Sequence, residues 1–166
     1  MAPGAFKRHF LRENEAKRIV AEFSKSLKMA SEELLGSKPD VEIAEVGTDE
    51  VFIINGEPAF AKSGERLFPT LVFEKLLRLL PKVVVDMGAV PHICNGADVM
   101  APGVLHIEGD FNKQEFVLIA DEHHGKPLAI GIALFDSRAT ENRKQGKIVK
   151  TIHHVGDKLW DALKKI

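Results

Sequence analysis

The sequence predicts an α+β protein made of a small α+β domain followed by a small closed β-barrel. Two observations lead to this fold class. The first half combines a long amphipathic helical pattern with a hairpin signal, and the second half carries several short apolar runs separated by turn residues. Short strands joined by regular turns are typical of a small barrel. The 166 residues suffice for one domain of average size or two small ones.

The first predicted element is one long amphipathic helix from Asn14 to Leu35. Gly36 suits the end of this helix, and Pro39 follows soon after it. Apolar residues recur along it at spacings of three and four, which places them on one stripe: Ala16, Ile19, Val20, Phe23, Leu27, Ala30 and Leu34.

Short strands follow this helix. Residues 41–46 alternate apolar and polar side chains, and Asn55-Gly56 lies between the strand-like runs 51–54 and 59–61. Asn-Gly between two such runs is a strong hairpin signal, because both central residues of a type I′ turn need a positive φ. We therefore expect a hairpin centred on Asn55 and Gly56.

A second helix is expected after Pro69, with Thr70 as its N-cap and Pro81 as its end. The boundary between the domains is placed here, giving residues 1–81 and 82–166. The helix would present one apolar face, formed by Leu71, Phe73, Leu76, Leu77 and Leu80.

The second half consists mainly of predicted strands, at residues 83–85, 116–120, 128–135 and 148–155. Gly131 interrupts one of these runs and indicates a bulge or a tight bend. Residues 123–127 form a turn, and the polar residues 137–146 form a surface segment. Asp157 is expected to N-cap a terminal helix.

The most unusual segment runs from Asp86 to Val104 and is rich in glycine and alanine. Gly96 suits the end of a short helix that begins near Gly88, and Pro102-Gly103 suits the centre of a type II turn. Small residues leave the backbone approachable, so that a phosphate or a base could contact N–H groups directly. Tight packing without any ligand explains the same residues equally well.

This segment resembles the signature of the PUA domain, named for pseudouridine synthase and archaeosine transglycosylase. The resemblance is carried by Asp86-x-Gly88-Ala89-Val90 and by Gly96-Ala97-Asp98-Val99-Met100-x-Pro102-Gly103-Val104. The end of the chain, residues 152–160, is similar to one subfamily, the translation-machinery-associated proteins, which include the malignant-T-cell-amplified protein and archaeal relatives. Residues 54–57 and 68–71 resemble the N-terminal pre-PUA domain of that subfamily.

The resemblance implies a small α+β pre-PUA domain, a PUA-type mixed β-barrel, and RNA binding in a groove beside the glycine-rich segment. Carried onto this chain, the RNA-binding positions are Gly88, Ala89, Asn95, Gly96, Ala97, Asp98, Met100, Pro102, Gly103 and His153.

Three of the neighbouring positions are assigned more closely. Val99 is expected in the core and Met100 near the surface. Asp98 would repel phosphate, so it is expected to accept a hydrogen bond from a base edge or to cap backbone. Relatives often carry Tyr where this chain has His154, which departs from the pattern.

The sequence offers little support for catalysis, a metal or a cofactor. Neighbouring residues of a strand point to opposite faces, so neither His123-His124 nor His153-His154 is expected to supply two ligands to one ion. The single cysteine, Cys94, is expected to be a small buried apolar residue. No nucleotide-binding glycine loop is present, and the first half is too short for an RNA-modifying catalytic domain. We therefore expect no enzyme activity and no cofactor.

The formal net charge is −1, so RNA binding requires a local basic patch. Basic residues of the second half are candidate phosphate contacts: Lys82, Lys113, Lys126, Arg143, Lys144, Lys147 and Lys150. By resemblance, the partners are tRNA or small-subunit rRNA, and a small ribosomal subunit or a translation factor, in initiation, reinitiation or recycling. Neither DNA nor a membrane is expected.

The N-terminus lacks the pattern of a signal peptide, and no apolar run is long enough to span a membrane, so a cytoplasmic protein is expected. Two alternative functions remain open. The barrel could be a protein-interaction module that has lost its RNA site, or an accessory subunit of an RNA-modification enzyme.

Overall fold

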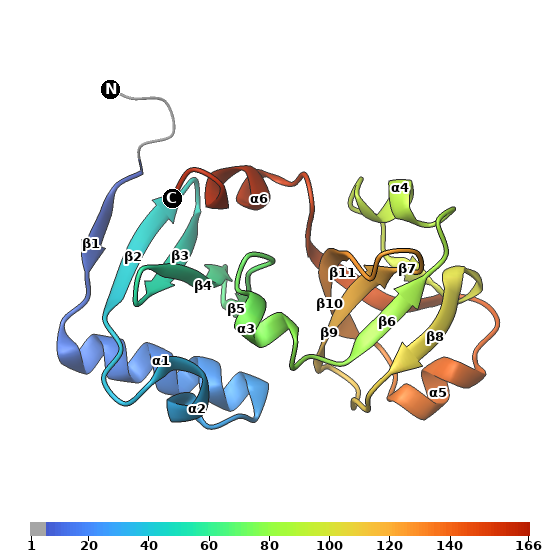
Figure 1. The fold of residues 1–166 in the computed structure, drawn as a ribbon, viewed down its shortest axis with the longest axis horizontal. Coiled ribbons are helices and arrows are strands. Elements are labelled where there is room, and N and C mark those ends of the chain that lie inside the picture. The colour runs from blue at the N-terminus through green and yellow to red at the C-terminus, as the bar shows by residue number, and fades with distance from the viewer. Residues whose placement is uncertain (1–5) are drawn as a thin grey trace. The chain divides into compact units, whose positions relative to one another are not determined.

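The structure is a computed structural model that describes residues 6–166, and the chain folds into two compact units (Figure 1). The first unit ends at Leu76 and also includes Ala162–Ile166, and the second comprises Leu77–Asp161. Both units combine helices with a β-sheet, which confirms the predicted α+β class. The division at residues 81 and 82 stays a prediction. No helix within residues 6–166 is both long and apolar enough to cross a membrane.

The first unit contains a five-stranded antiparallel sheet in the order β1-β2-β3-β4-β5. Its strands are β1 (Arg8–Phe10), β2 (Val41–Val46), β3 (Asp49–Ile54), β4 (Glu57–Ser63) and β5 (Arg66–Pro69). The two edge strands were not predicted. All three residues of β1 are exposed, so they show no alternation, and β1 is defined by its pairing with β2.

The predicted hairpin joins β3 to β4. Asn55 has φ 51° and Gly56 has φ 85°, as a type I′ turn requires, so this prediction is confirmed. The side chain of Asn55 adds two contacts, accepting from Asp40 N at 3.0 Å and donating to Leu35 O at 3.1 Å. It therefore fixes both the turn and the chain that leads into β2.

The prediction of one helix from Asn14 to Leu35 is wrong, because the segment forms α1 (Glu13–Leu27) and α2 (Ser31–Leu35). Lys28 adopts φ 56°, and its N–H donates to Lys25 O, while Met29 N donates to Ser24 O. These two bonds form a Schellman motif, which ends a helix even without glycine. Gly36 ends α2 as expected.

An aromatic stack joins α1 to the sheet of the first unit. Phe23 of α1 stacks on Phe60 with ring centroids 4.0 Å apart, and Phe52 stacks on the same ring at 4.8 Å. All three side chains are buried, so they form the centre of this core.

Thr70 is not the predicted N-cap. Its hydroxyl donates to Pro58 O at 3.0 Å, and Pro69 ends the edge strand β5, where the missing N–H of proline costs no ladder bond. The helix that follows, α3 (Glu74–Leu77), is shorter than expected. The apolar side chains assigned to its face are nevertheless buried: Leu71, Phe73, Leu76, Leu77 and Leu80.

The second unit contains a six-stranded sheet in the order β7-β11-β10-β9-β6-β8. The pair β6–β9 is parallel and the other pairs are antiparallel, so the sheet is mixed. Its strands are β6 (Lys82–Val85), β7 (Val99–Met100), β8 (Val104–Glu108), β9 (Phe116–Asp121), β10 (Pro127–Ala133) and β11 (Lys147–His154). The sheet curves around a core that includes Val83, Val85, Ile93, Val117, Ile119 and Ile148.

Gly131 allows β10 and β11 to bend together. The register shifts between Ile130 and Gly131, which confirms the predicted bulge. A Cβ at Gly131 would overlap Cγ1 of Val149 and would lie 3.0 Å from Cδ1 of Ile119, so no larger residue fits without movement of the strands.

Two short helices complete the second half. The helix α5 (Ser137–Asn142) lies inside the segment that was predicted only as polar surface, and Asp136 caps it by accepting from Ala139 N at 2.8 Å. The terminal helix α6 (Lys158–Leu163) has the predicted N-cap, since Asp157 Oδ1 accepts from Trp160 N at 2.6 Å.

Candidate nucleic-acid interface

The chain leaves β6 through a tight turn that Asp86 closes. Its carboxylate accepts from Ala89 N at 2.9 Å, and its own N–H donates to Gly103 O at 3.0 Å. A Cβ at Gly103 would lie 3.2 Å from that of Ala89, so the two backbones meet because both residues are small. A tertiary contact thus brings Ala89 and Gly103 together.

The predicted type II turn at Pro102-Gly103 is wrong. Residues Ala101–Gly103 form a 3₁₀ turn, in which Val104 N donates to Ala101 O. Gly103 does not have a positive φ. Its lack of a side chain is needed for the close approach to Ala89 and not for a left-handed conformation.

The short helix α4 (Val90–Ile93) has Cys94 as its C-cap, so it ends before the predicted Gly96, which lies in the turn that follows. Gly96 has φ 92°, its N–H donates to Ile93 O at 3.0 Å, and Ala97 N donates to His92 O at 3.0 Å. These N–H groups are therefore engaged, as is that of Ala89. Backbone capture of a phosphate, which the small residues suggested, has no free donor at these three positions.

Asp98 ties the glycine-rich segment to β11. Its Oδ1 accepts from Thr151 N at 2.9 Å, and its Oδ2 lies 2.8 Å from Lys147 Nζ. Burial raises the pKa of Asp98, but the bonds from Lys147 and Thr151 and the charges of Lys147 and Lys150 outweigh burial and hold the pKa below its usual value. Of its two expected roles, capping backbone is the one seen.

The pair Val99 and Met100 divides between core and surface as predicted, with 2% and 48% of each residue exposed. Met100 pairs with Lys147 in the register of β7 and β11. The remaining predicted positions differ in exposure. Those on the surface are Gly88, Asn95, Gly96, Ala97 and Pro102, and those half-buried are Ala89, Asp98 and Gly103.

Only part of the predicted basic set lies beside this segment. Lys147 and Lys150 both act on Asp98, and the Arg143 guanidinium packs over the Phe135 ring at 4.0 Å. For Lys82 and Lys113, by contrast, no contact with Asp98 is described: Lys82 begins β6 and Lys113 precedes β9. Lys82 lies about 13 Å along the strand from Asp86, where the glycine-rich segment begins.

Three turns meet at one end of the sheet. Val85 lies beside Asp121 in the parallel pair, and Ala129 pairs with His154, so the turn after β6, the 122–126 hairpin and the end of β11 are neighbours. Asp121 accepts from His124 N at 2.6 Å and from Lys126 N at 3.2 Å. These backbone bonds lower the pKa of Asp121 and fix the hairpin.

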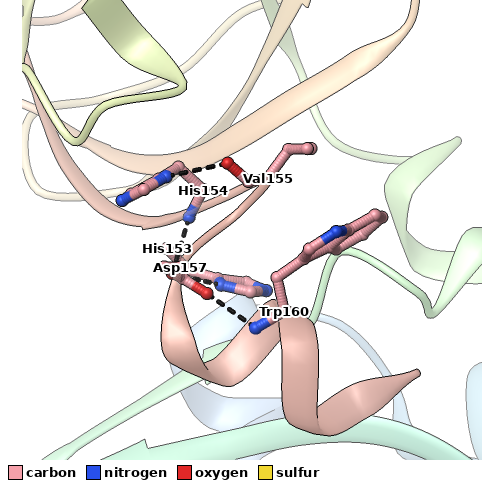
Figure 2. Close-up of polar contacts among 5 residues, drawn as sticks. All are labelled: His153, His154, Val155, Asp157 and Trp160. Carbon is pink, nitrogen blue, oxygen red and sulfur yellow. Dashed lines mark hydrogen bonds and ion pairs between the residues drawn. The ribbon is translucent and has the colours of Figure 1, made fainter. Parts of the chain in front are cut away.

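His153 is fully buried, which contradicts the expectation that it contacts RNA directly. Its Nδ1 lies 2.9 Å from Asp157 Oδ2, and Asp157 also accepts from His154 N and Trp160 N (Figure 2). Burial raises the pKa of Asp157, but the bond and charge of His153 and the two backbone donors outweigh it, and the pKa lies below its usual value. His153 therefore holds the end of β11 in place.

His154 is the residue that sequence reasoning missed. It is half-buried, its Nδ1 lies 3.0 Å from Val155 O, and its Nε2 lies 3.3 Å from the position of a Cβ on Gly96. The sequence marked His154 only as a departure from relatives. Its contact with Gly96 depends on how β11 ends, which no local pattern encodes.

Cys94 is half-buried rather than fully buried, and burial raises the pKa of its thiol. Within residues 6–166, no three His, Cys, Asp or Glu side chains gather as metal ligands would.

Comparison with known proteins gives two matching families. Residues 81–155 match the PUA domain, and residues 7–78 match a domain of unknown function (DUF1947). An uncharacterized protein of Methanocaldococcus jannaschii is 37% identical over 158 residues, covering 93% of this chain and 96% of that protein.

Named relatives are more distant. Translation machinery-associated protein 20 of Eremothecium gossypii is 30% identical over 152 residues, covering 87% of this chain and 83% of that protein. Malignant T-cell-amplified sequence 1 of Danio rerio is 29% identical over 116 residues, covering 67% and 64%. Among solved structures, a hypothetical protein from Pyrococcus horikoshii OT3 is similar with TM-score 0.78 and 36% identity, covering 95% of this chain and 99% of that one.

Proposed function

This chain belongs to the family of PUA-domain proteins that includes translation machinery-associated protein 20 and malignant T-cell-amplified sequence 1, and we propose that it binds RNA in translation. The observation that carries the proposal is the exposed glycine-rich segment bordered by Lys147 and Lys150. The RNA is tRNA or small-subunit rRNA, and the process is initiation, reinitiation or ribosome recycling in the cytoplasm of an archaeal cell.

Local charge supports RNA binding despite a net charge of −1. Lys147 and Lys150 are exposed on β11 beside Met100, so cationic and apolar groups share one surface. Lysine ammonium groups carry three donors, and Lys147 can bond a phosphate oxygen while it remains near Asp98. The backbone N–H groups of Ala89, Gly96 and Ala97 already donate within the protein. Phosphate groups would therefore be contacted by the side chains of Lys147 and Lys150.

Binding without catalysis is the proposed activity. The only thiol, that of Cys94, has a raised pKa, so its thiolate is disfavoured at neutral pH. His153 is buried against Asp157, and neither residue is placed near an exposed nucleophile in the described contacts. The first unit would dock on the small ribosomal subunit or on a translation factor.

The test is filter binding of the protein to deacylated tRNA, with and without its single-stranded 3′ end, at two salt concentrations. We expect binding that weakens with salt and requires the 3′ end, because phosphate contacts release counterions. Absence of binding at either salt would exclude tRNA, and the same assay with small-subunit rRNA would then follow; absence of binding to both RNAs would overturn the proposal and favour a protein-interaction module.

A matched pair of variants locates the surface. The double change Lys147→Gln and Lys150→Gln should weaken binding and reduce the salt slope by about 2, because each lysine that no longer neutralises a phosphate lowers the slope by roughly one. The control is Lys82→Gln with Lys113→Gln, which removes the same charge from two lysines that do not act on Asp98 and should leave the slope unchanged. Equal effects from both pairs would contradict the assigned surface.

A further inference from the structure

His154 presents a hydrogen-bond acceptor beside Gly96. Its Nδ1 lies 3.0 Å from Val155 O (Figure 2). A carbonyl oxygen can only accept, so Nδ1 carries the proton in this bond. In the neutral ring the other nitrogen, Nε2, then has a free lone pair and is an acceptor.

That acceptor is open to solvent. Among the contacts of residues 6–166, none involves Nε2 of His154 as donor or acceptor. The described residues also contain no buried side-chain nitrogen or oxygen that lacks a partner. An unpartnered Nε2 on a half-buried residue must therefore reach the surface.

The ring is held in this orientation without a ligand. The N–H of His154 donates to Asp157 Oδ2 at 2.9 Å, and Asp157 is itself fixed by His153 and Trp160. With Nδ1 bound to Val155 O, both the backbone and the ring of His154 are anchored. Such preorganisation reduces the ordering cost of binding.

The part of the ring nearest the glycine is the side formed by Nε2 and Cδ2. Nε2 and Cδ2 lie 3.3 and 3.7 Å from the position of a Cβ on Gly96. Gly96 is exposed and has no side chain, so a ligand can approach its backbone closely. A ligand group beside Gly96 can therefore reach Nε2 of His154.

The chemistry of the ligand group follows from that lone pair. A phosphate oxygen is an acceptor and cannot bond a neutral Nε2, so the group must be a donor. RNA carries donors on its bases and on the ribose 2′-hydroxyl, and the latter is absent from DNA. The exposed large apolar side chains of the second unit, Leu79, Met87, Met100 and Leu105, are all aliphatic, and its exposed rings are histidines such as His92. Every nucleotide of RNA carries the 2′-hydroxyl whatever its base, which favours the sugar as the donor.

We propose that Nε2 of His154 accepts a hydrogen bond from a ribose 2′-hydroxyl of RNA bound over Gly96, so that His154 distinguishes RNA from DNA. This inference rests on the proposed RNA binding and names the group that the site reads. His154 is a specificity-determining residue, and His153 and Asp157 are positioning residues that act through it.

The experiment measures the affinity of the full chain for tRNA carrying ribose or 2′-deoxyribose at single positions of its 3′-terminal single strand. At one position, the native protein should bind the ribose form about three- to tenfold more tightly, the value of one hydrogen bond. His154→Phe keeps an aromatic ring but removes the acceptor, and it should bind both forms with equal affinity, at the level of the native protein with the deoxy form.

His9→Phe is the matched control, because His9 is an exposed histidine of the first unit. It should retain the full ribose preference. His154→Gln, which places an amide oxygen on a chain of similar reach, should restore part of the preference, whereas a merely structural role for His154 would lower affinity for both forms alike.

The outcomes separate this inference from the proposed function. If His154→Phe retains the ribose preference, or if the native protein binds tRNA without one, the inference is overturned and RNA binding stands. His154→Phe could also lower affinity when no single 2′-deoxy substitution lowers the affinity of the native protein. That result would indicate a donor on a base and would also overturn the inference. If the native protein binds neither tRNA nor small-subunit rRNA, the proposed function and the inference both fail.

Discussion

The loops of the two units are held by different means. In the first unit, the turn at Asn55 and the break at Lys28 depend on left-handed backbone conformations, and the core is a stack of aromatic rings. In the second unit, aspartate side chains accept from backbone N–H groups at five places: Asp86, Asp98, Asp121, Asp136 and Asp157.

This difference between the units indicates that aspartate hydrogen bonds hold the candidate site rigid. Carboxylates that accept charge-assisted bonds hold backbone firmly, because such bonds are stronger than those between neutral groups. Asp86, Asp98 and Asp157 hold three segments around Gly96 and Gly103. An interface built from small residues offers few side chains that could hold it together, so it depends on these anchors.

The largest expected effect concerns the first unit. Phe60→Ala removes the ring that contacts both Phe23 and Phe52, and it should lower the free energy of unfolding by about 3–5 kcal/mol. Urea denaturation gives the value, and hydrogen exchange at β3 and β4 shows where protection is lost. A decrease in the free energy of unfolding of less than about 1 kcal/mol would contradict the view that this stack forms the centre of the core of the first unit.

A second change addresses close packing in the second unit. Gly131→Ala places a Cβ against Val149 Cγ1, and the displacement of β11 should lower the free energy of unfolding by about 3 kcal/mol. Gly125→Ala is the control, since a Cβ there meets nothing within 4 Å although φ is 62°. It should cost about 1 kcal/mol, from conformation alone. Equal decreases would show that the bulge tolerates a side chain.

The smallest effect, and the one that most sharpens the comparison, concerns Asp157. Asp157→Asn removes the charge opposite His153 and should lower the free energy of unfolding by about 2 kcal/mol at pH 7. The pKa of Asp157 is lowered in the folded state, so its stabilising contribution is present above the usual value of 3.8 and is lost as pH falls through the folded pKa.

Stability measured by urea denaturation from pH 6 down to pH 2 checks this sign. The native protein should lose stability below about pH 4, and Asp157→Asn should lose less over the same range. Asp110→Asn, at an exposed carboxyl of the β8–β9 loop, serves as the control and should follow the native curve. If the stability of Asp157→Asn depended on pH in the same way as that of the native protein, the Asp157 carboxylate would not stabilise the second unit as described.

Much of the fold could be predicted because its signals are local. The Asn55-Gly56 turn, the helix end at Gly36 and the cap at Asp157 each depend on a few adjacent residues. The errors arose where distant contacts decide. Thr70 is a residue type that often caps helices, but its hydroxyl donates to Pro58 O instead. The strand β1 is defined by its pairing with β2, which is distant in sequence.

The candidate site shows the same division. Residues of the glycine-rich segment were found by their composition, and the core position of Val99 and the surface position of Met100 were assigned correctly. The positions of His153 and His154 were not assigned correctly. Neighbouring residues of β11 face opposite sides, and only the packed structure shows which side is buried. Which lysines lie near Asp98 likewise depends on the pairing of β7 with β11.

By itself, the sequence determined the α+β class, the hairpin, the bulge at Gly131 and the position of the glycine-rich segment. Only the tertiary structure decided that the amides of this segment are engaged, that His153 is buried and that Nε2 of His154 faces Gly96. The physical reason is separation along the chain. Turn and cap preferences act over a few residues, whereas residues 96 and 154 meet only after six strands have closed into one sheet.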